Sequence, residues 1–278
     1  MFLYQYELGK ACDILVKELF KLKPGETFVI TADTESDPRV VDAAASAAFT
    51  ISAKPMVIWL PSPLIEGKLA DSILPLNSLT GALMGADAWL EINNKQIFDS
   101  TPSQIALKEN KKLRYLGLTG ATVSMVVRCI GRVNYPVLKE FIHYVANATK
   151  AARHVRMTTP VTIKMVKGII VNIEGKAEAN SWRNWLSSLD DPIIYHLSHF
   201  NIGLNPKAKL SGNETEDEVI VGAISFGFGH QPEALKGNIT TGKFHTEVIL
   251  ASPTIYIDDI VVSKNNKLNE EIGFIKMV

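Results

Sequence analysis

The sequence has few cysteines, no excess of charge of either sign and no long apolar run. Its 278 residues include two cysteines, Cys12 and Cys129, which lie far apart and form no CxxC pair. So little cysteine argues against a disulfide scaffold and favours a reducing compartment. Lysine plus arginine number 29, as do aspartate plus glutamate. This balance gives no general electrostatic attraction to nucleic acid or to an anionic membrane.

Other missing features narrow the class further. The first residues, MFLYQYELGKACDILVKELF, lack a basic leader followed by an apolar core, so we expect no signal peptide. No apolar run approaches the roughly 20 residues that cross a bilayer, and no glycine-rich dinucleotide fingerprint is found. We therefore expect a globular cytoplasmic protein with one large domain or two ordinary ones. A net charge of zero also favours association into a homo-oligomer.

The first half alternates strand-like and helix-like segments. Apolar, β-branched runs predict four strands, at 27–33, 54–60, 87–92 and 113–119. Asp37 is the expected N-cap of a helix that begins at Pro38, and Pro102 lies at the start of another. Strands separated by such helices are typical of a parallel, doubly wound sheet. We expect an α/β domain over residues 1–156 that closes with an amphipathic helix at 134–155.

The character of the sequence changes near Met157. The run VTIKMVKGIIVNIEG predicts a hairpin with Lys167 and Gly168 at its turn, and ANSWRNWLSSL predicts one helix after it. Further strand-like runs lie between glycine-rich loops, at 193–200, 218–228, 243–250 and 254–262. We therefore expect a β-rich α+β domain over residues 157–278.

One of these runs, GKFHTEVIL, carries polar residues that suggest a metal site. His245 and Glu247 are two positions apart, so on a strand both side chains project from one face. His199, which precedes the turn NIGLNP, is the best donor of a third ligand. Two histidines and one carboxylate leave open positions on a metal for substrate and dioxygen, as in non-haem Fe(II) enzymes. The spacing alone also fits, and more often accompanies, a strand that shows two polar residues to water.

Two further residues are candidates for catalytic roles. His230 lies in the loop GFGHQPEAL, where it either reaches a metal cavity as an acid or base or lies in water. A regular strand from Tyr195 to Phe200 would place Tyr195, Leu197 and His199 on one face. Tyr195 would then either hydrogen-bond a substrate or pack in the core.

Three segments, SHFNIGLNP, VGAISFGFG and GNITTGKFHTEV, resemble the C-terminal half of the aminopeptidase T family of metallopeptidases. They are more similar to an offshoot of that family, the iron-dependent 2,5-dihydroxypyridine 5,6-dioxygenases. The peptidases hold two metals with two glutamates, two histidines and an aspartate, of which this chain keeps His245 and, in place of the aspartate, Glu247. His199 stands at a glutamate position, Ser225 at a histidine position, and 157–163 contains no carboxylate.

The dioxygenases use a histidine before the G-x-NP turn and an H-x-D pair, which His199, His245 and Glu247 match more closely. The resemblance therefore implies a β-rich metal-binding catalytic domain. It also implies a mononuclear Fe²⁺ enzyme that opens the ring of a hydroxylated N-heteroaromatic substrate with dioxygen. Zn²⁺, Co²⁺ or Mn²⁺ are the alternative metals.

Two other functions remain open from the sequence. A metal-dependent aminopeptidase or other amide hydrolase would need more carboxylates, which the acidic loop GNETEDEV would supply if it folded inward. A relative without turnover would bind a small molecule or a partner through the same fold.

Overall fold

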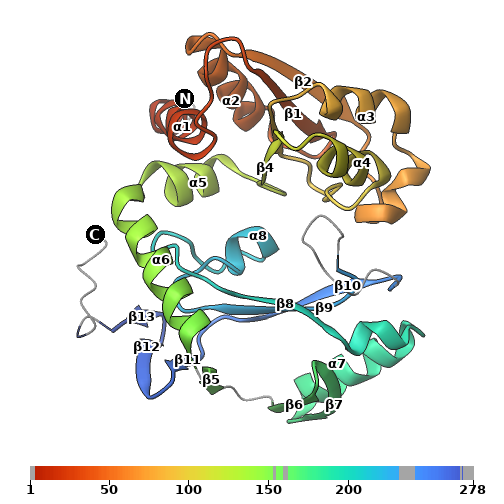
Figure 1. Cartoon of the computed structure of the whole chain (residues 1–278), viewed down its shortest axis with the longest axis vertical. Coiled ribbons are helices and arrows are strands. Elements are labelled where there is room, and N and C mark those ends of the chain that lie inside the picture. Colours follow the sequence, from red (N-terminus) through yellow and green to blue (C-terminus); the bar gives the residue numbers. More distant parts are fainter. Residues whose placement is uncertain (1–3, 153–154, 159–161, 232–241, 270, 272–278) are drawn as a thin grey trace. The chain divides into compact units, whose positions relative to one another are not determined.

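Two units divide the chain, Met1–Arg132 and Val133–Val278 (Figure 1). The computed structural model describes residues 4–152, 155–158, 162–231, 242–269 and 271. Residues 159–161 and the segment GNITT of the family resemblance lie outside this described part. The two units are described separately below.

The first unit is built on a four-stranded sheet with strand order β2-β1-β3-β4. The strands are β1 (Thr27–Asp33), β2 (Lys54–Leu60), β3 (Ala88–Glu91) and β4 (Arg114–Gly117). All three pairings are parallel, and every residue of β1 after Thr27 is buried. A central strand that is buried on both faces reads as a continuous apolar run, as TFVITA does. The parallel α/β architecture expected from the sequence is confirmed.

Helices lie on both sides of this sheet (Figure 1). They are α1 (Gln5–Ile14), α2 (Pro38–Thr50), α3 (Leu76–Met84), α4 (Thr101–Glu109) and α5 (Val123–Val126). Short π-helical segments lie at Leu15–Leu19 and Val127–Gly131, and a 3₁₀ helix lies at Gly67–Ser72. The Asp37 carboxylate caps α2 by accepting from the Arg39 N–H, as predicted. Trp89 is fully buried in a cluster that includes Leu79 of α3 and Ala106 of α4.

The second unit contains small antiparallel sheets and two long helices. Its elements up to the first site strand are α6 (Tyr135–Ala151), β5 (Val155–Thr158), β6 (Thr162–Val166), β7 (Ile169–Glu174), α7 (Ala177–Ser188), the 3₁₀ turn η4 (Pro192–Tyr195) and β8 (Leu197–Ile202). The remainder are α8 (Glu214–Asp217), β9 (Ile224–Gly229), β10 (His245–Leu250), β11 (Thr254–Ile257), β12 (Ile260–Lys264) and β13 (Lys267–Leu268). The sheets have strand orders β10-β9-β8, β13-β12-β11-β5 and β6-β7. This β-rich α+β organisation is the one predicted.

The division between the units falls 24 residues earlier than the expected boundary after residue 156. The difference is the helix α6, which the sequence assigned to the first domain. Its residues Leu138, Phe141 and Val145 are buried in one cluster with Ile224 and with residues of β11 and β12. An amphipathic pattern shows that a helix has an apolar side, but it does not show which core that side packs against.

Three predicted strand runs are shorter or divided in the structure. The run 193–200 begins with the turn η4, and 218–228 forms a strand only from Ile224. The run 254–262 is a hairpin of β11 and β12, with Asp258 in the left-handed backbone region at its turn. Aspartate tolerates this conformation better than most residues, so the turn has a local cause.

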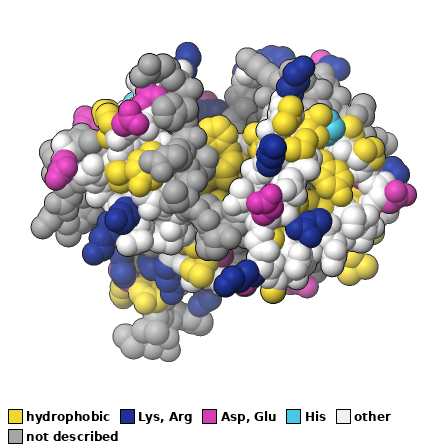
Figure 2. Space-filling view, turned by 90° about the horizontal axis from the view of Figure 1, so that it is seen from below, with side chains coloured by type: hydrophobic (Ala, Val, Ile, Leu, Met, Phe, Trp, Pro, Cys, Tyr) yellow, Lys and Arg dark blue, Asp and Glu magenta, His cyan; other side chains and the backbone are white. Residues whose placement is uncertain are grey.

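The surface carries charges of both signs. On the face in Figure 2, lysine and arginine side chains lie among aspartate and glutamate side chains, in keeping with the net charge of zero. In the part of the chain that the structure describes, every helix is too short or too polar to cross a membrane.

Candidate metal centre

The sheet β10-β9-β8 brings the three predicted ligands to one face. Strands β8 and β10 both pair antiparallel with β9, and Gly227 of β9 is the register partner of both His199 and Glu247. Directly paired residues project from the same face of an antiparallel sheet. His199 and Glu247 therefore lie on either side of Gly227, and His245, two positions before Glu247, shares their face.

Gly227 makes room for this arrangement. A Cβ atom added to it would lie 2.3 Å from Cε1 of His199, well inside van der Waals contact. The imidazole therefore lies across the glycine and toward β10. The neighbouring Phe226 and Phe228 project to the opposite face, where Phe228 is fully buried in an apolar cluster. In the sequence FGFG the phenylalanines thus pack into the core from one face of β9, and the glycines leave space on the other face for side chains of the flanking strands.

A β-bulge sets the direction of His199. The pairing shifts between Leu197, which opposes Phe228, and His199, which opposes Gly227, so Ser198 is the extra residue. The predicted alternation, in which Tyr195, Leu197 and His199 share a face, is therefore wrong. Tyr195 lies in the turn η4, and both Tyr195 and Leu197 pack against the apolar cluster around Phe228. This placement gives Tyr195 a packing role on the face opposite to His199.

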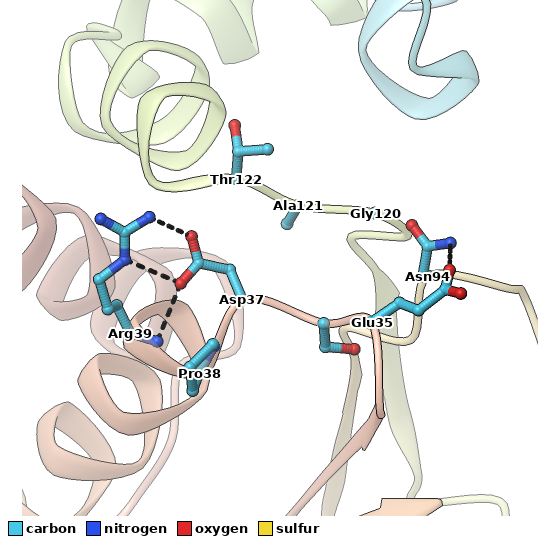
Figure 3. A pocket seen from close by; sticks show the side chains of 9 residues that line it. Glu35, Asp37, Pro38, Arg39, Asn94, Gly120, Ala121 and Thr122 are labelled. Atoms are coloured by element: carbon cyan, nitrogen blue, oxygen red, sulfur yellow. Dashed lines mark hydrogen bonds and ion pairs between the residues drawn. The ribbon is translucent and has the colours of Figure 1, made fainter. Parts of the chain in front are cut away.

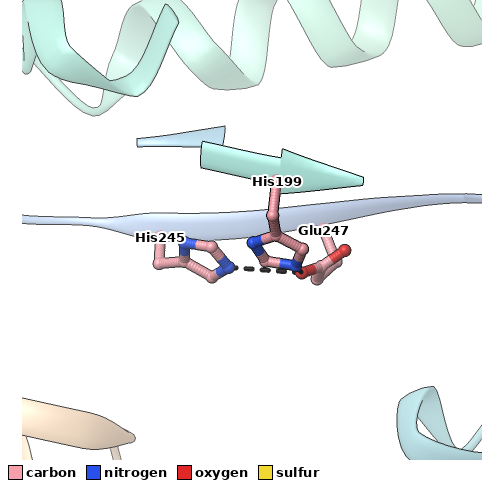
Figure 4. Close-up of side chains that lie close together, drawn as sticks. All are labelled: His199, His245 and Glu247. Atoms are coloured by element: carbon pink, nitrogen blue, oxygen red, sulfur yellow. Dashed lines mark hydrogen bonds and ion pairs between the residues drawn. The ribbon is translucent and has the colours of Figure 1, made fainter. Parts of the chain in front are cut away.

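The three side chains converge at hydrogen-bond distances (Figure 4). Oε1 of Glu247 lies 2.6 Å from Nε2 of His199 and 3.3 Å from Nε2 of His245. The two imidazole rings are nearly parallel, with centroids 5.3 Å apart and an interplanar angle of 11°. One ligand atom from each residue lies within 4.8 Å of the other two, a grouping that fits a single metal ion. The Glu247 side chain is only 10% exposed, whereas the imidazoles are about one-third exposed.

The far side of the His245 ring fixes its tautomer. Its Nδ1 lies 2.7 Å from the backbone carbonyl oxygen of His230, which can only accept, so Nδ1 carries a proton. In the neutral ring Nε2 then carries a lone pair, and this lone pair faces the Glu247 carboxylate. Either a second proton or a metal ion must lie between them. Metal-binding histidines commonly donate their other ring N–H to a carbonyl in this way.

His230 thus contributes its backbone to the centre, a role that its side-chain chemistry did not predict. Its N–H also donates to the Phe244 carbonyl at 2.8 Å, which ties the chain after β9 to the start of β10. The carbonyl is consequently held beside His245 by the sheet itself. The half-buried side chain of His230 stays a candidate acid or base.

Opposing effects set the protonation of the pair. Burial alone would raise the pKa of Glu247, but hydrogen bonds from His199 and His245 outweigh it and lower the pKa to about 2. Burial alone would lower the pKa of His245, but the hydrogen bonds to Glu247 and to the His230 carbonyl raise it. The site therefore stabilises a negative carboxylate beside positive charge, which is the electrostatic condition that a bound cation also satisfies.

A further observation indicates that these three residues suit a divalent metal ion. Oε2 of Glu247 is buried and has no hydrogen-bond partner among the described residues. A buried carboxylate oxygen without a donor is costly, and a cation held by this carboxylate would remove that cost. Two imidazole nitrogens and one carboxylate oxygen suit Fe(II), Mn(II), Co(II) or Zn(II) better than Ca²⁺ or Mg²⁺.

The acidic loop does not add ligands to this group. Oε1 of Glu216 accepts from the Lys209 N–H, and the Asp217 carboxylate accepts from the N–H groups of Ser211 and Gly212. Both side chains are buried, where they hold the loop 209–213. Glu214 is exposed, and Glu218 is not among the three residues whose ligand atoms lie within 4.8 Å. In the described chain, therefore, the centre has ligands for one metal.

The first unit has a hollow of its own, a cavity of about 610 Å³ (Figure 3). It lies where β1, β3 and β4 end, and its lining includes Glu35, Asp37, Arg39, Asn94 and Thr122. The carboxylate of Asp37 is already paired with Arg39 at 2.6 Å, and Glu35 accepts from the Asn94 amide at 2.7 Å. Both carboxylates in the lining therefore already have a polar partner.

Comparison with the sequences of known proteins finds similarity mainly in the second unit. A family model described as NicX, 2,5-dihydroxypyridine 5,6-dioxygenase, matches residues 148–270. The 2,5-dihydroxypyridine 5,6-dioxygenase of Pseudomonas putida KT2440 is 28% identical over 109 residues, or 37% of this chain. That match spans 31% of the length of the relative. The matched family region contains β8, β9 and β10, and hence all three candidate ligands.

Solved structures extend the likeness to both units. The structure of 2,5-dihydroxypyridine dioxygenase from P. putida KT2440 covers 95% of this chain and 97% of its own, with a TM-score of 0.70 and 18% identity. Wild-type AmpT from Thermus thermophilus covers 95% and 99%, with a TM-score of 0.60 and 12% identity. These likenesses show the fold. The resemblance expected from the sequence is thus confirmed: the chain has the aminopeptidase T-like fold, and its C-terminal region matches the family of the dihydroxypyridine dioxygenases.

Proposed function

We propose that this chain is a mononuclear Fe(II) dioxygenase that opens the ring of a hydroxylated N-heteroaromatic compound. The convergence of Nε2 of His199 and Nε2 of His245 on the Glu247 carboxylate carries the proposal. Such a set binds one side of a metal and leaves the other side for substrate and dioxygen. The family match over 148–270 supports the reaction class and makes 2,5-dihydroxypyridine the first substrate to test.

Bound Fe(II) would supply the electronic link between a chelating substrate and dioxygen. The protein's part is to hold the donor atoms in place. The His230 carbonyl fixes the His245 ring through Nδ1, and Gly227 leaves space for the His199 ring. Glu247 supplies a negative charge that balances part of the charge of the metal. We expect a small aromatic substrate and dioxygen as partners, and the cytoplasmic location and homo-oligomer inferred from the sequence stay predictions.

The aminopeptidase alternative is weaker on the described residues. A two-metal hydrolytic centre needs bridging and flanking carboxylates, whereas Glu216 and Asp217 are buried against backbone N–H groups. Ser225 also stands where the resemblance places a histidine of the peptidases. A mononuclear centre is the reading that these contacts support.

Metal stoichiometry and oxygen consumption test the proposal together. Protein purified without oxygen and loaded with Fe(II) should bind one iron per chain. With 2,5-dihydroxypyridine it should then consume dioxygen and place both atoms of ¹⁸O₂ in the ring-opened product. Two metals per chain with cleavage of leucine p-nitroanilide would identify the hydrolase instead. One iron per chain without oxygen consumption on any hydroxypyridine would contradict the ring-opening reaction.

A further inference from the structure

The face that carries the candidate ligands continues into a second polar row. Asn201 of β8 and Ser225 of β9 are register partners and lie two residues along their strands from His199 and Gly227. They therefore project from the same face as the ligands. Two residues of a strand span about 6.6 Å, so the second row lies about the width of a substituted six-membered ring from the first.

Glu218 reaches this second row from outside the sheet. It follows α8, which lies on the other side of the sheet from α7 (Figure 1). Its Oε2 lies 3.5 Å from both the Ser225 hydroxyl and the Asn201 amide nitrogen, and that amide also donates to Ser225 at 3.3 Å. The buried contacts of Glu216 and Asp217 anchor the loop before it. Glu216 and Asp217, which bind backbone N–H groups of the loop, thus position Glu218 over the sheet.

The Glu218 carboxyl group is poorly satisfied where it lies. Both of its hydrogen bonds within the described chain use Oε2, and both are at the long limit for such a bond. Burial, followed by the negative charge of Glu247, raises the pKa of Glu218 to about 7. A partly buried carboxyl with long contacts gains from a closer polar partner. That partner would lie between Glu218 and the ligand row.

We propose that Glu218, backed by Ser225 and Asn201, binds the polar hydrogen of the substrate, a ring N–H or a hydroxyl, beside the metal. This inference deepens the proposed function and rests on it. A ring that chelates a metal at the row of Glu247 extends along the face toward the row of Ser225, where a carboxyl oxygen is available. Glu218 then distinguishes hydroxylated N-heteroaromatic rings from rings of the same shape that lack the donor.

Substrate binding without turnover separates this role from metal binding. Iron-loaded protein kept free of oxygen is titrated with 2,5-dihydroxypyridine, and with its N-methylated and O-methylated forms, each of which removes one donor. In E218A the affinity for 2,5-dihydroxypyridine should fall about 10- to 100-fold, as expected for a lost hydrogen bond to a charged group. The affinity for one methylated form should stay within about twofold, since the contact is already absent. Iron stoichiometry should not change.

Matched variants keep the result interpretable. E178A removes an exposed acid of α7, on the other side of the sheet, and should bind every ring as the wild type does. E218Q keeps the side-chain shape and serves if E218A unfolds; S225A should weaken binding a few-fold. A uniform loss for all rings would overturn the recognition role, and loss of iron in E218A would make Glu218 a metal ligand instead. Normal iron and oxygen consumption with an unchanged E218A would sink this inference alone, whereas a wild type that binds no ring would remove the proposed function with it.

Discussion

Each unit has a glutamate on a strand with a side chain that is largely buried, and the pKa values of these two carboxyl groups shift in opposite directions. Glu91 ends β3 in the first unit and is fully buried, with neutral donors around it: the Ile97 N–H and the Tyr115 hydroxyl. Burial dominates, and the pKa of Glu91 rises to about 7. Glu247 lies on β10 in the second unit between two imidazoles, and its pKa falls to about 2. Both groups are hydrogen-bonded, so the difference comes from the charge that the partners can carry.

This contrast separates a structural acid from a candidate ligand. Glu91 accepts from a backbone N–H six residues ahead, in the segment before α4, and so holds that segment to the sheet. Glu247 faces groups that become cationic or bind a cation, and its second oxygen has no partner in the described chain. Burial of a carboxylate alone therefore does not identify a metal site. The identifying features are a nearly buried carboxylate with one oxygen close to two imidazole nitrogens and a second oxygen without a partner in the described chain.

Loss of an imidazole should give the largest effect, because it removes one of the two ring nitrogens that distinguish the surroundings of Glu247 from those of Glu91. H245A removes one of three ligands, and we expect Fe(II) affinity to fall by more than about 100-fold, since losing an outer-shell partner already costs about 10- to 100-fold. Competition with a chelator of known affinity measures this. H143A is the control, because His143 is exposed on α6 in the same unit. Equal iron affinity in both variants would remove His245 from the centre.

From the sequence, several strands and the grouping of His245 with Glu247 could be predicted, but no role for Glu91. The strands at 27–33 and 54–60 form at their predicted bounds, because TFVITAD and KPMVIWL favour strands wherever they pack. Lys167 and Gly168 both have positive φ at the predicted hairpin turn. The i, i+2 spacing of His245 and Glu247 placed both on one face, and the structure brings His199 to them. Their role as ligands stays a prediction.

What the sequence did not predict depends on contacts between distant segments. The bulge at Ser198 arises from pairing with β9, and local alternation cannot reveal an extra residue. Glu218 faces the sheet because Glu216 and Asp217 are used elsewhere, while all three look alike in GNETEDEV. The hydrogen bonding of Glu91 likewise depends on Tyr115, 24 residues later in the chain. The alternation FGFG was the one local signal for Gly227.

A smaller effect is expected from crowding the centre without removing a ligand. In G227A the new methyl group would lie 2.3 Å from the His199 ring, so the imidazole must turn away from Glu247. We expect Fe(II) affinity to fall about 10- to 100-fold, the range of an outer-shell change, while circular dichroism stays unchanged. G81A is the matched control, since a Cβ at Gly81 of α3 meets no atom within 4 Å. Unchanged iron affinity in G227A would show that His199 does not need its observed position.

The smallest effect concerns stability and tests the other half of the contrast. The folded-state pKa of Glu91 lies above its usual value of 4.5, so the folded chain binds more protons than the unfolded chain between pH 4.5 and about 7. Stability from this group is therefore greatest below pH 4.5 and is lost as pH rises to about 7, by at most about 3 kcal/mol. E91Q should flatten this slope in urea unfolding at pH 5 and pH 8. E109Q, which removes an exposed acid on α4, should leave the slope unchanged.

For Glu247 in metal-free protein we expect a slope of the opposite sign, because its lowered pKa adds stability above pH 4.5 that is lost toward pH 2. E247Q is therefore compared with the wild type at pH 2 and pH 5. If E91Q and E247Q changed the slope in the same direction, each in its own pH range, the charge of the neighbouring groups would not be what separates the two carboxylates.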